Sequence, residues 1–142
     1  MSAVDTGRAD GGDEARYRRE LPLREGMVVQ EVGWSRDVDD AFRDIVVDVI
    51  GGGLVDEGYG GDVDAVLLWW RAGEGVLADA LLAAGAVLSE GRFVLLLTPK
   101  VGGYVRPEDI DEAVVLTGFH RASAIELRHW HGVLLTKPSR SR

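Results

Sequence analysis

The sequence predicts an α/β fold: a Rossmann-like open sheet of about five strands, mostly parallel, with helices on both faces and a C-terminal antiparallel hairpin. Apolar residues at helical spacing alternate along the chain with short β-branched or apolar runs. Two of these runs, residues 64–70 and 92–98, are apolar almost throughout, which is typical of parallel strands buried on both faces. The last two runs lie too close together for a crossover helix, so we expect them to pair as the hairpin near one edge.

The first predicted strand is followed by an amphipathic helix. Residues 27–32 (MVVQEV) form a β-branched run that ends at Gly33, a pattern typical of a strand. Asp37 then stands at the expected N-cap of the helix, with Asp40 three residues further on. The helix ends at the glycines 51–53, and its apolar residues recur at helical spacing: Val38, Phe42, Ile45, Val46, Val49 and Ile50.

A strand, a helix and a further strand come next. Residues 64–70 (DAVLLWW) and 92–98 (RFVLLLT) are the two apolar strands, and Pro99 stops the second of them. Between them, apolar residues at 77–88 form one face of a helix that we expect to end at Gly91.

The last part of the chain adds one helix and two strands. Pro107 suits the first position of the helix, acidic residues follow in its first turn, and Gly118 ends it. Two strands, at about residues 122–128 and 133–136, close the chain. The order β-α-β-α-β-α-β-β with buried parallel strands is that of an open Rossmann-like sheet.

Composition divides the 142 residues into one domain and two tails. Residues 1–20 hold five acidic and four basic residues and few apolar side chains, so we expect a disordered N-terminal tail. Residues 138–142 (PSRSR) are expected to form a second disordered end. The single folded domain is therefore predicted to span residues 21–137.

Charge and cysteine content exclude several classes of function. The net charge is −8, opposite in sign to the basic footprint of proteins that bind nucleic acid or anionic membranes. The absence of cysteine excludes disulfides, thiolate metal sites and cysteine nucleophiles. No apolar run has the length of a membrane span, and the N-terminal residues lack the apolar core of a signal peptide. We expect a cytoplasmic protein with no nucleic-acid or membrane partner.

Short strings in the sequence resemble two known groups of proteins. VVQEVGW, DAVLLWWR and LLTPK, in this order, are similar to an actinobacterial family known as domain of unknown function 3052, over about residues 21–136. LSEGRFVLLLTPK resembles the segment that enters the fifth strand of class I S-adenosylmethionine-dependent methyltransferases, and DAVLLWW resembles the strand before it. This resemblance implies a methyltransferase-like Rossmann fold with a terminal hairpin.

The chain departs from the methyltransferase pattern in two places. After the first strand, Glu31 and Gly33 remain, but the later glycines of a cofactor loop are missing and the bulky Trp34 occupies the loop. Residues 51–62 show no pattern for the second and third strands of that sheet, the second of which normally supplies an acid for the ribose. We therefore expect no resident cofactor; S-adenosylmethionine binding ranks last among the functions considered, and methyl transfer is not expected.

The missing strands leave the first strand at a sheet edge. An apolar edge invites pairing with another strand. Either residues 51–62 cover this edge or a second copy of the chain does, and the second solution predicts a homodimer.

Candidate ligand-binding residues come from the loops beyond the carboxyl ends of the parallel strands, where open sheets bind ligands. Trp69 and Trp70 point to opposite faces of their strand, so we favour Trp70 with Arg71 as lining a pocket. The alternative is that the tryptophans complete the core and the charges face water. Tyr59, in a glycine-rich loop, is a candidate lid residue. The full set is Glu31, Gly33, Trp34, Tyr59, Trp70, Arg71, Lys100, Gly102, Gly103 and Tyr104.

No metal site is expected. His129 and His131 would share one face of a strand, but two histidines leave most of a coordination shell unfilled, and Glu126 would lie on the face opposite His129.

The leading functional hypothesis is an accessory or regulatory factor that binds a small molecule or a protein partner. The alternative is a cofactor-independent cyclase or isomerase of specialised metabolism that uses the aromatic pocket. A pocket lined by aromatic residues and closed to water favours the enzyme, whereas a filled crevice with an apolar external patch favours the binding factor.

Overall fold

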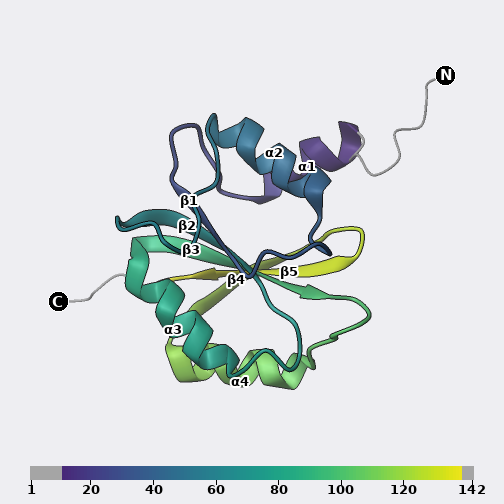
Figure 1. Ribbon diagram of the computed structural model, residues 1–142, viewed down its shortest axis with the longest axis vertical. Coiled ribbons are helices and arrows are strands. Elements are labelled where there is room, and N and C mark those ends of the chain that lie inside the picture. The colour runs from purple at the N-terminus through teal and green to yellow at the C-terminus, as the bar shows by residue number, and fades with distance from the viewer. Residues whose placement is uncertain (1–10, 139–142) are drawn as a thin grey trace.

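The computed structural model describes residues 11–138, in which five strands form one open sheet of order β1-β2-β3-β5-β4 (Figure 1). β1, β2 and β3 are parallel, and β5 runs antiparallel to its neighbours β3 and β4. The predicted sheet, mostly parallel with an antiparallel hairpin at one edge, is therefore confirmed. The strands are Val29–Val32 (β1), Val63–Trp69 (β2), Leu88–Pro99 (β3), His120–Glu126 (β4) and Trp130–Thr136 (β5).

Helices cover both faces of the sheet, as predicted. Alternate residues of each buried strand point to opposite faces: Leu67 packs in the layer of α1 and α2, and Leu68 packs in the layer of α3 and α4. Within residues 11–138, no helix has the length and apolar character needed to cross a bilayer. The helices are Gly11–Glu20 (α1), Asp40–Ile50 (α2), Leu77–Val87 (α3) and Pro107–Thr117 (α4).

Helix α1 corrects the predicted N-terminal tail. Residues 11–20 are helical, and the ring of Tyr17 packs edge-on against Phe42 of α2 with centroids 5.2 Å apart. The charges of the segment, which suggested disorder, have partners: Arg18 pairs with Asp48 at 2.6 Å, and Arg16 donates to the carbonyl of Glu126 at 2.9 Å. Residues 1–10 and 139–142 of the two predicted tails lie outside the described part of the chain.

Two helix boundaries differ from the prediction. Asp39, not Asp37, caps α2: its backbone is extended and its carboxylate accepts a hydrogen bond from the backbone N–H of Phe42 at 2.9 Å. Helix α3 ends at Val87, before the expected Gly91, because Leu88 is already paired with Val63 at the start of β3. The remaining predicted ends, Gly51 for α2 and Gly118 for α4, are confirmed and both adopt the left-handed conformation.

The free edge of β1 is covered by the chain itself. Val55, in the segment after α2, donates its N–H to the carbonyl of Val29 at 2.9 Å and accepts the N–H of Glu31 at 2.8 Å. This short parallel bridge takes the position that a further strand of a methyltransferase sheet would occupy. The edge therefore needs no second copy of the chain, and the reason for expecting a homodimer there is removed.

Candidate binding site

The loops that follow β1, β2 and β3 meet at the carboxyl end of the sheet. Arg71 Nη1 donates to the carbonyl of Gly33 at 3.0 Å, which joins the first loop to the second. The N–H of Ala72 donates to the carbonyl of Gly103 at 2.8 Å, which joins the second loop to the third. Gly102 and Gly103 have φ values of 58° and 100°, so the third loop turns through a backbone conformation that favours glycine.

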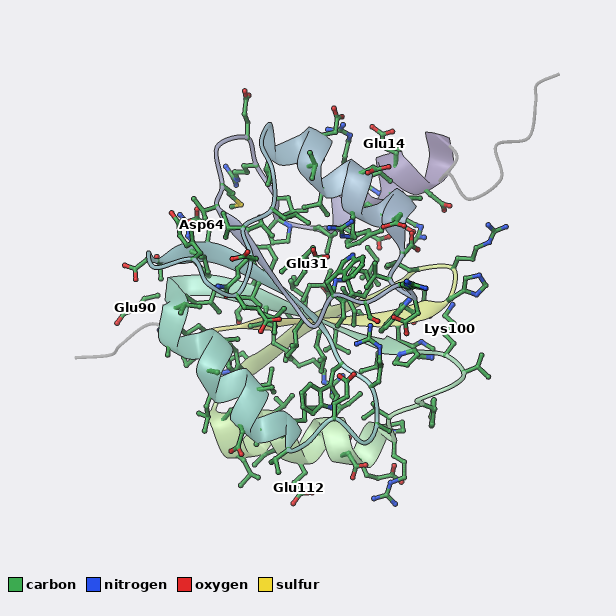
Figure 2. All side chains as sticks on the ribbon, in the orientation of Figure 1. Glu14, Glu31, Asp64, Glu90, Lys100 and Glu112 are labelled. Atoms are coloured by element: carbon green, nitrogen blue, oxygen red, sulfur yellow. The ribbon has the colours of Figure 1, made fainter. Side chains whose placement is uncertain are left out.

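The predicted site residues nevertheless have different surroundings. In Figure 2, Glu31 lies inside the molecule and Lys100 lies beside the β4–β5 hairpin. Lys100 Nζ donates to the carbonyl of Leu127 at 2.7 Å and pairs with Glu126 at 3.2 Å. By contrast, three of the predicted aromatic residues are exposed at the surface: Trp34, Tyr59 and Tyr104.

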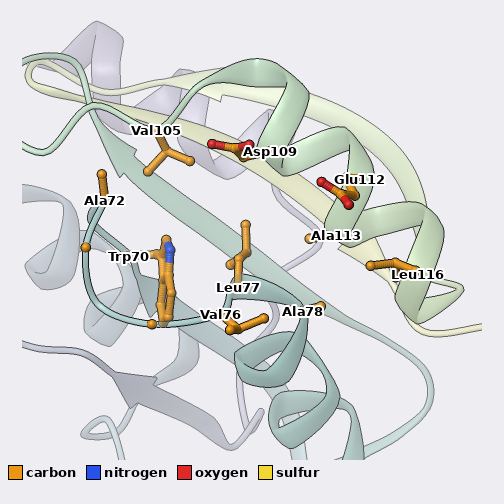
Figure 3. Close-up of a pocket in the computed structure, with 12 residues that line it drawn as sticks. Trp70, Ala72, Val76, Leu77, Ala78, Val105, Asp109, Glu112, Ala113 and Leu116 are labelled. Carbon is orange, nitrogen blue, oxygen red and sulfur yellow. The ribbon is translucent and has the colours of Figure 1, made fainter.

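Trp70 is the one predicted site residue that lines a groove between the β2–α3 loop and α4 (Figure 3). The groove has a volume of about 290 Å³. The carboxylates of Asp109 and Glu112, one turn apart on α4, lie along it. Its larger apolar lining residues are Trp70, Val76, Leu77, Val105 and Leu116.

Two of these lining side chains are exposed although they are apolar. Val76, just before α3, is 61% exposed, and Leu116, at the end of α4, is 68% exposed. Sequence reasoning missed α4 as part of a site because it considered only loops beyond the strands. A signal was available: Val114, Val115 and Leu116 are consecutive, so they cannot all face the core from one helix.

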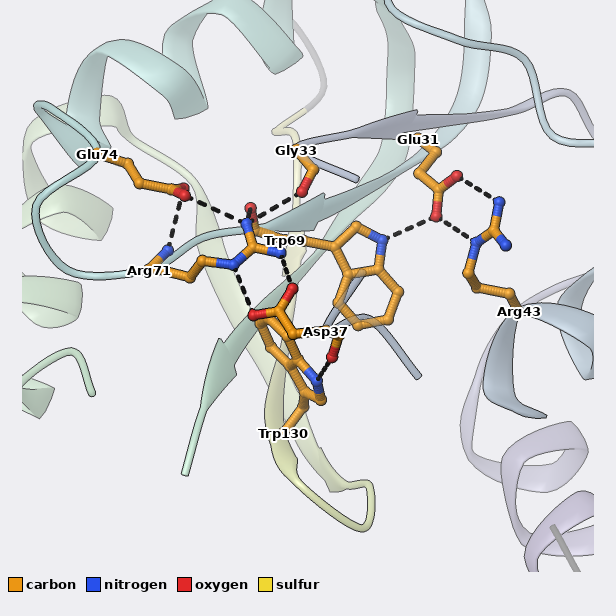
Figure 4. A network of polar contacts seen from close by, with 8 residues as sticks. All are labelled: Glu31, Gly33, Asp37, Arg43, Trp69, Arg71, Glu74 and Trp130. Atoms are coloured by element: carbon orange, nitrogen blue, oxygen red, sulfur yellow. Dashed lines mark hydrogen bonds and ion pairs between the residues drawn. The ribbon is translucent and has the colours of Figure 1, made fainter. Parts of the chain in front are cut away.

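Arg71, predicted to line a pocket with Trp70, instead holds two loops together (Figure 4). Its guanidinium forms a bidentate pair with Asp37, at 2.6 and 3.0 Å, and a further contact with Glu74 at 3.2 Å. It also lies over the ring of Trp130, 5.2 Å from the centroid. These hydrogen bonds hold the pKa of the Asp37 carboxyl below its usual value. The Arg71 side chain is only 14% exposed.

Glu31 belongs to a second, more buried part of the same network. Its two carboxylate oxygens accept a bidentate pair of bonds from Arg43 at 2.6 and 2.8 Å. The Trp69 indole N–H donates to the same carboxylate at 2.9 Å. Trp69 packs edge-on against Trp130, whose N–H donates to the carbonyl of Asp37 at 3.0 Å. Within the described residues, no buried side-chain nitrogen or oxygen lacks a partner.

Gly33 is required by a contact between two strands. Its φ of +81° favours glycine, and an added Cβ would lie 2.3 Å from the carbonyl oxygen of Trp69. Its N–H donates to the Glu57 carboxylate at 3.0 Å. The group that approaches Gly33 closely is thus the neighbouring strand end.

Most of the chain matches one protein family. A family described as "Protein of unknown function (DUF3052)" matches residues 18–139. The chain belongs to this family. Uncharacterized proteins of Mycobacterium tuberculosis and Mycobacterium bovis are 37% identical to the DUF3052 chain over 126 residues, which cover 87% of this chain and 80% of each relative. The predicted membership of an actinobacterial family is confirmed.

The fold of this DUF3052 chain is shared by solved methyltransferase structures. A precorrin-6y C5,15-methyltransferase from Geobacter metallireducens has a TM-score of 0.61 at 12% identity, with 98% of this chain and 94% of that chain covered. An O-methyltransferase family 2 protein from Planctomyces limnophilus, in complex with apigenin, has a TM-score of 0.61 at 13% identity, with 87% and 57% covered. At these identities the likeness establishes the fold alone, and the predicted methyltransferase-like architecture is confirmed.

The DUF3052 chain uses internally the groups that a cofactor loop after β1 would offer to a ligand. The Glu31 carboxylate is held by Arg43 and Trp69. The N–H and the carbonyl of Gly33 are both bonded within the chain. The segment beside β1 forms a single bridge at Val55, and the two acids that follow it accept hydrogen bonds within the chain: Asp56 from the N–H of Gly58 at 2.9 Å and Glu57 from the N–H of Gly33 at 3.0 Å. In this structure these groups are therefore engaged within the chain.

The histidines of the terminal hairpin form no metal centre. His129 lies in the turn, so it does not share a strand face with His131. His131 Nδ1 instead contacts the Glu126 carboxylate at 2.8 Å, because the two residues are cross-strand partners. Across residues 11–138, no three potential ligands are gathered for a metal ion.

Proposed function

We propose that this protein is a non-catalytic binding factor that retains a methyltransferase-like fold without its cofactor site, and that it acts as an accessory or regulatory protein. One observation carries the proposal: the crevice beyond β1 and β2 is filled by the chain's own residues. Trp69, Trp130 and Arg71 occupy it, and their polar atoms bond to Glu31 and Asp37.

A cofactor entering this crevice would have to separate Arg71 from Asp37 and move Trp130. Breaking this bidentate ion pair is costly, because Arg71, whose side chain is only 14% exposed, would lose its main charged partner. Displacing Trp130 would also remove the packing of its ring against Trp69 and Arg71. The network therefore favours a closed crevice over a binding site.

The groove between the β2–α3 loop and α4 supports a binding role for a different part of the molecule. Val76 and Leu116 are exposed apolar residues on its two sides, and Val115, next to Leu116 in the sequence, is 79% exposed. Grouped apolar side chains at a surface are typical of an interaction site. A protein partner is the ligand that such an open surface suits best.

The competing hypothesis is a cofactor-independent cyclase or isomerase with a pocket formed by Trp34, Trp70, Arg71, Lys100 and Tyr104, two of which, Arg71 and Lys100, are cations. Both side chains bond to partners within the chain. Among residues 11–138, the groove beside Trp70 brings two carboxylates to one aromatic ring, with no histidine, lysine or arginine in its lining to act as their partner in acid–base chemistry. The binding role is therefore the better supported of the two.

Isothermal titration calorimetry with S-adenosylmethionine and S-adenosylhomocysteine tests the proposal. We expect no saturable heat from either compound at concentrations up to about 1 mM, a range in which weak cofactor binding is still detectable. Trp70→Ala is the matched variant, because it alters the groove and leaves the Arg71–Asp37 network in place. Saturable binding that persists in Trp70→Ala would assign the cofactor to the crevice and overturn the proposal.

A further inference from the structure

The groove beside α4 combines an apolar surface with carboxylates. Trp70 and Val105 lie at its inner end, and the exposed side chains of Val76 and Leu116 border it (Figure 3). Leu116 stands one turn along α4 from Glu112. An apolar side chain docked against Leu116 would therefore bring its neighbours within reach of a carboxylate.

The charge of the groove has one sign. Asp109 and Glu112 line it, and no lysine, arginine or histidine does. Asp109 pairs with Arg106 at 3.0 Å, an interaction that lowers the pKa of its carboxyl and keeps it ionised at neutral pH. Arg106 pairs directly with Asp109 and acts on Glu112 only through longer-range electrostatic attraction, since no hydrogen bond or ion pair of Glu112 is found among the described residues. An incoming cation thus finds, next to an apolar surface, a carboxylate that no cation contacts directly.

We propose that this groove binds a segment of a partner protein in which a lysine or arginine stands among apolar side chains. The inference rests on the proposed binding function and names its partner by chemistry. The apolar part of the segment would pack on Trp70, Val76 and Leu116, and the cation would pair with Glu112. Charge complementarity of this kind sets specificity and association rate more than raw affinity.

A protein segment fits the groove better than the two other occupants. A second copy of this chain, with a net charge of −8, would bring like charges together at Asp109 and Glu112. A small molecule is best held where most of its surface is enclosed, but here Val76 and Leu116 remain exposed and the apolar surface continues to Val115 on α4.

Peptide binding to the full chain tests the inference. The probe is a fluorescein-labelled, 18-residue amphipathic peptide of leucine and lysine, and the control is the same peptide with glutamate in place of lysine. Fluorescence anisotropy measures both at 50 and 150 mM salt, because a pair between charges weakens as salt rises. We expect saturable binding of the lysine peptide, weaker at the higher salt, and no binding of the glutamate peptide.

Matched variants separate the groove from general attraction to an acidic protein. Asp109→Asn with Glu112→Gln should weaken binding about tenfold, whereas Glu25→Gln with Asp44→Asn, which removes the same charge elsewhere, should change it less than about twofold. For the apolar part, Leu116→Ser should weaken binding about tenfold or more. Val101→Ser, at a residue that is 78% exposed outside the groove, should leave it unchanged.

Four results would overturn the inference, and the fourth is an absence of peptide binding. Equal losses in the two double variants would show attraction to overall charge, equal affinity for the glutamate peptide would exclude recognition of a cation, and a dimer that Leu116→Ser dissociates would assign the groove to a second copy. The proposed function fails by a different result, which is saturable binding of the cofactor in calorimetry. Absence of both cofactor and peptide binding overturns only the inference about the groove.

Discussion

Arg71 and Asp37 form a bidentate ion pair between two loops at the carboxyl end of the sheet. Their nitrogen–oxygen distances are 2.6 and 3.0 Å, and 34 residues separate them in the sequence. Arg71 also bonds to the carbonyl of Gly33 and lies over Trp130. One side chain thus fixes the loop after β1 against the loop after β2 and closes the crevice between them.

Replacing Arg71 by lysine tests this role. Arg71→Lys keeps the charge but loses the planar fork, so we expect the free energy of unfolding to fall by about 1–2 kcal/mol. Tryptophan fluorescence in urea measures it. Arg121→Lys is the control, because Arg121 pairs with Asp111 at the surface, where such pairs contribute less than about 1 kcal/mol. Equal effects of the two substitutions would contradict the assigned role.

The same pair predicts a pH dependence. Arg71 lowers the pKa of Asp37 below its usual value of 3.8. The stability that this shift contributes is therefore present above pH 3.8 and is lost as the pH falls through the folded-state pKa. Urea midpoints measured between pH 6 and pH 2 should fall less steeply in Asp37→Asn than in the unmodified protein. Identical slopes in the two proteins would contradict this linkage.

Glu31 is predicted to be needed for folding. Glu31→Gln leaves the partly buried Arg43 without its main partner, and we expect a loss of about 2–4 kcal/mol in the free energy of unfolding. Asp40→Asn is a matched control because Asp40 also bonds Arg43, at 3.2 Å, but is 74% exposed. That substitution should change the urea midpoint little. A larger effect of Asp40→Asn than of Glu31→Gln would refute the assignment.

A comparison of Gly33→Ala with Gly26→Ala separates the cost of backbone strain from the cost of steric contact. At Gly33 the added Cβ would lie 2.3 Å from the carbonyl of Trp69, at a φ of +81°, so we expect a loss of about 3 kcal/mol. Gly26 has a φ of +90° and open space around its Cβ position. Gly26→Ala should therefore show the strain alone, about 1 kcal/mol. Thermal unfolding followed by circular dichroism measures both, and similar losses would argue against close contact between Gly33 and Trp69.

Tyr17 predicts behaviour at high pH. Burial, and then the nearby Asp13, raise the pKa of Tyr17 above its usual value of 10.0. The folded state thus holds the hydroxyl proton of Tyr17 more tightly than the unfolded state does. The stability that this contributes is retained below pH 10.0 and lost as the pH rises above it, by up to about 1.4 kcal/mol per pH unit. Between pH 9 and pH 11, the urea midpoint of Tyr17→Phe should fall less than the urea midpoint of the unmodified protein. Tyr104→Phe, at an exposed ring, should follow the unmodified protein.

The sequence predicted the mostly parallel sheet and the order of elements along the chain because the buried strands have a continuous apolar pattern. Residues 64–70 and 92–98 have that pattern, and both became central strands of the parallel part. Helix α1 was missed because, among its residues whose burial is described, only Tyr17 is buried in the core. Its stability comes from packing on α2 and from ion pairs with distant residues, which local composition does not reveal.

The candidate site was harder to predict than the fold. Sequence position places Arg71 and Lys100 at the correct end of the sheet. It does not reveal that Asp37 and Glu126, distant in the chain, neutralise them. The groove was missed for a related reason, because its carboxylates come from α4 while its tryptophan comes from the end of β2. Such combinations depend on how helices pack, which periodicity alone does not determine.

The four tryptophans provide the most direct test of the account. Trp34 stands exposed after β1, Trp69 and Trp130 fill the crevice, and Trp70 lines the groove. Their indole N–H resonances can be followed in one nitrogen-15-labelled NMR sample, titrated first with S-adenosylmethionine and then with the lysine peptide. We predict that S-adenosylmethionine moves none of the four and that the peptide moves Trp70 alone. Saturable shifts of Trp34, Trp69 and Trp130 with S-adenosylmethionine would contradict the account and assign the crevice to a cofactor.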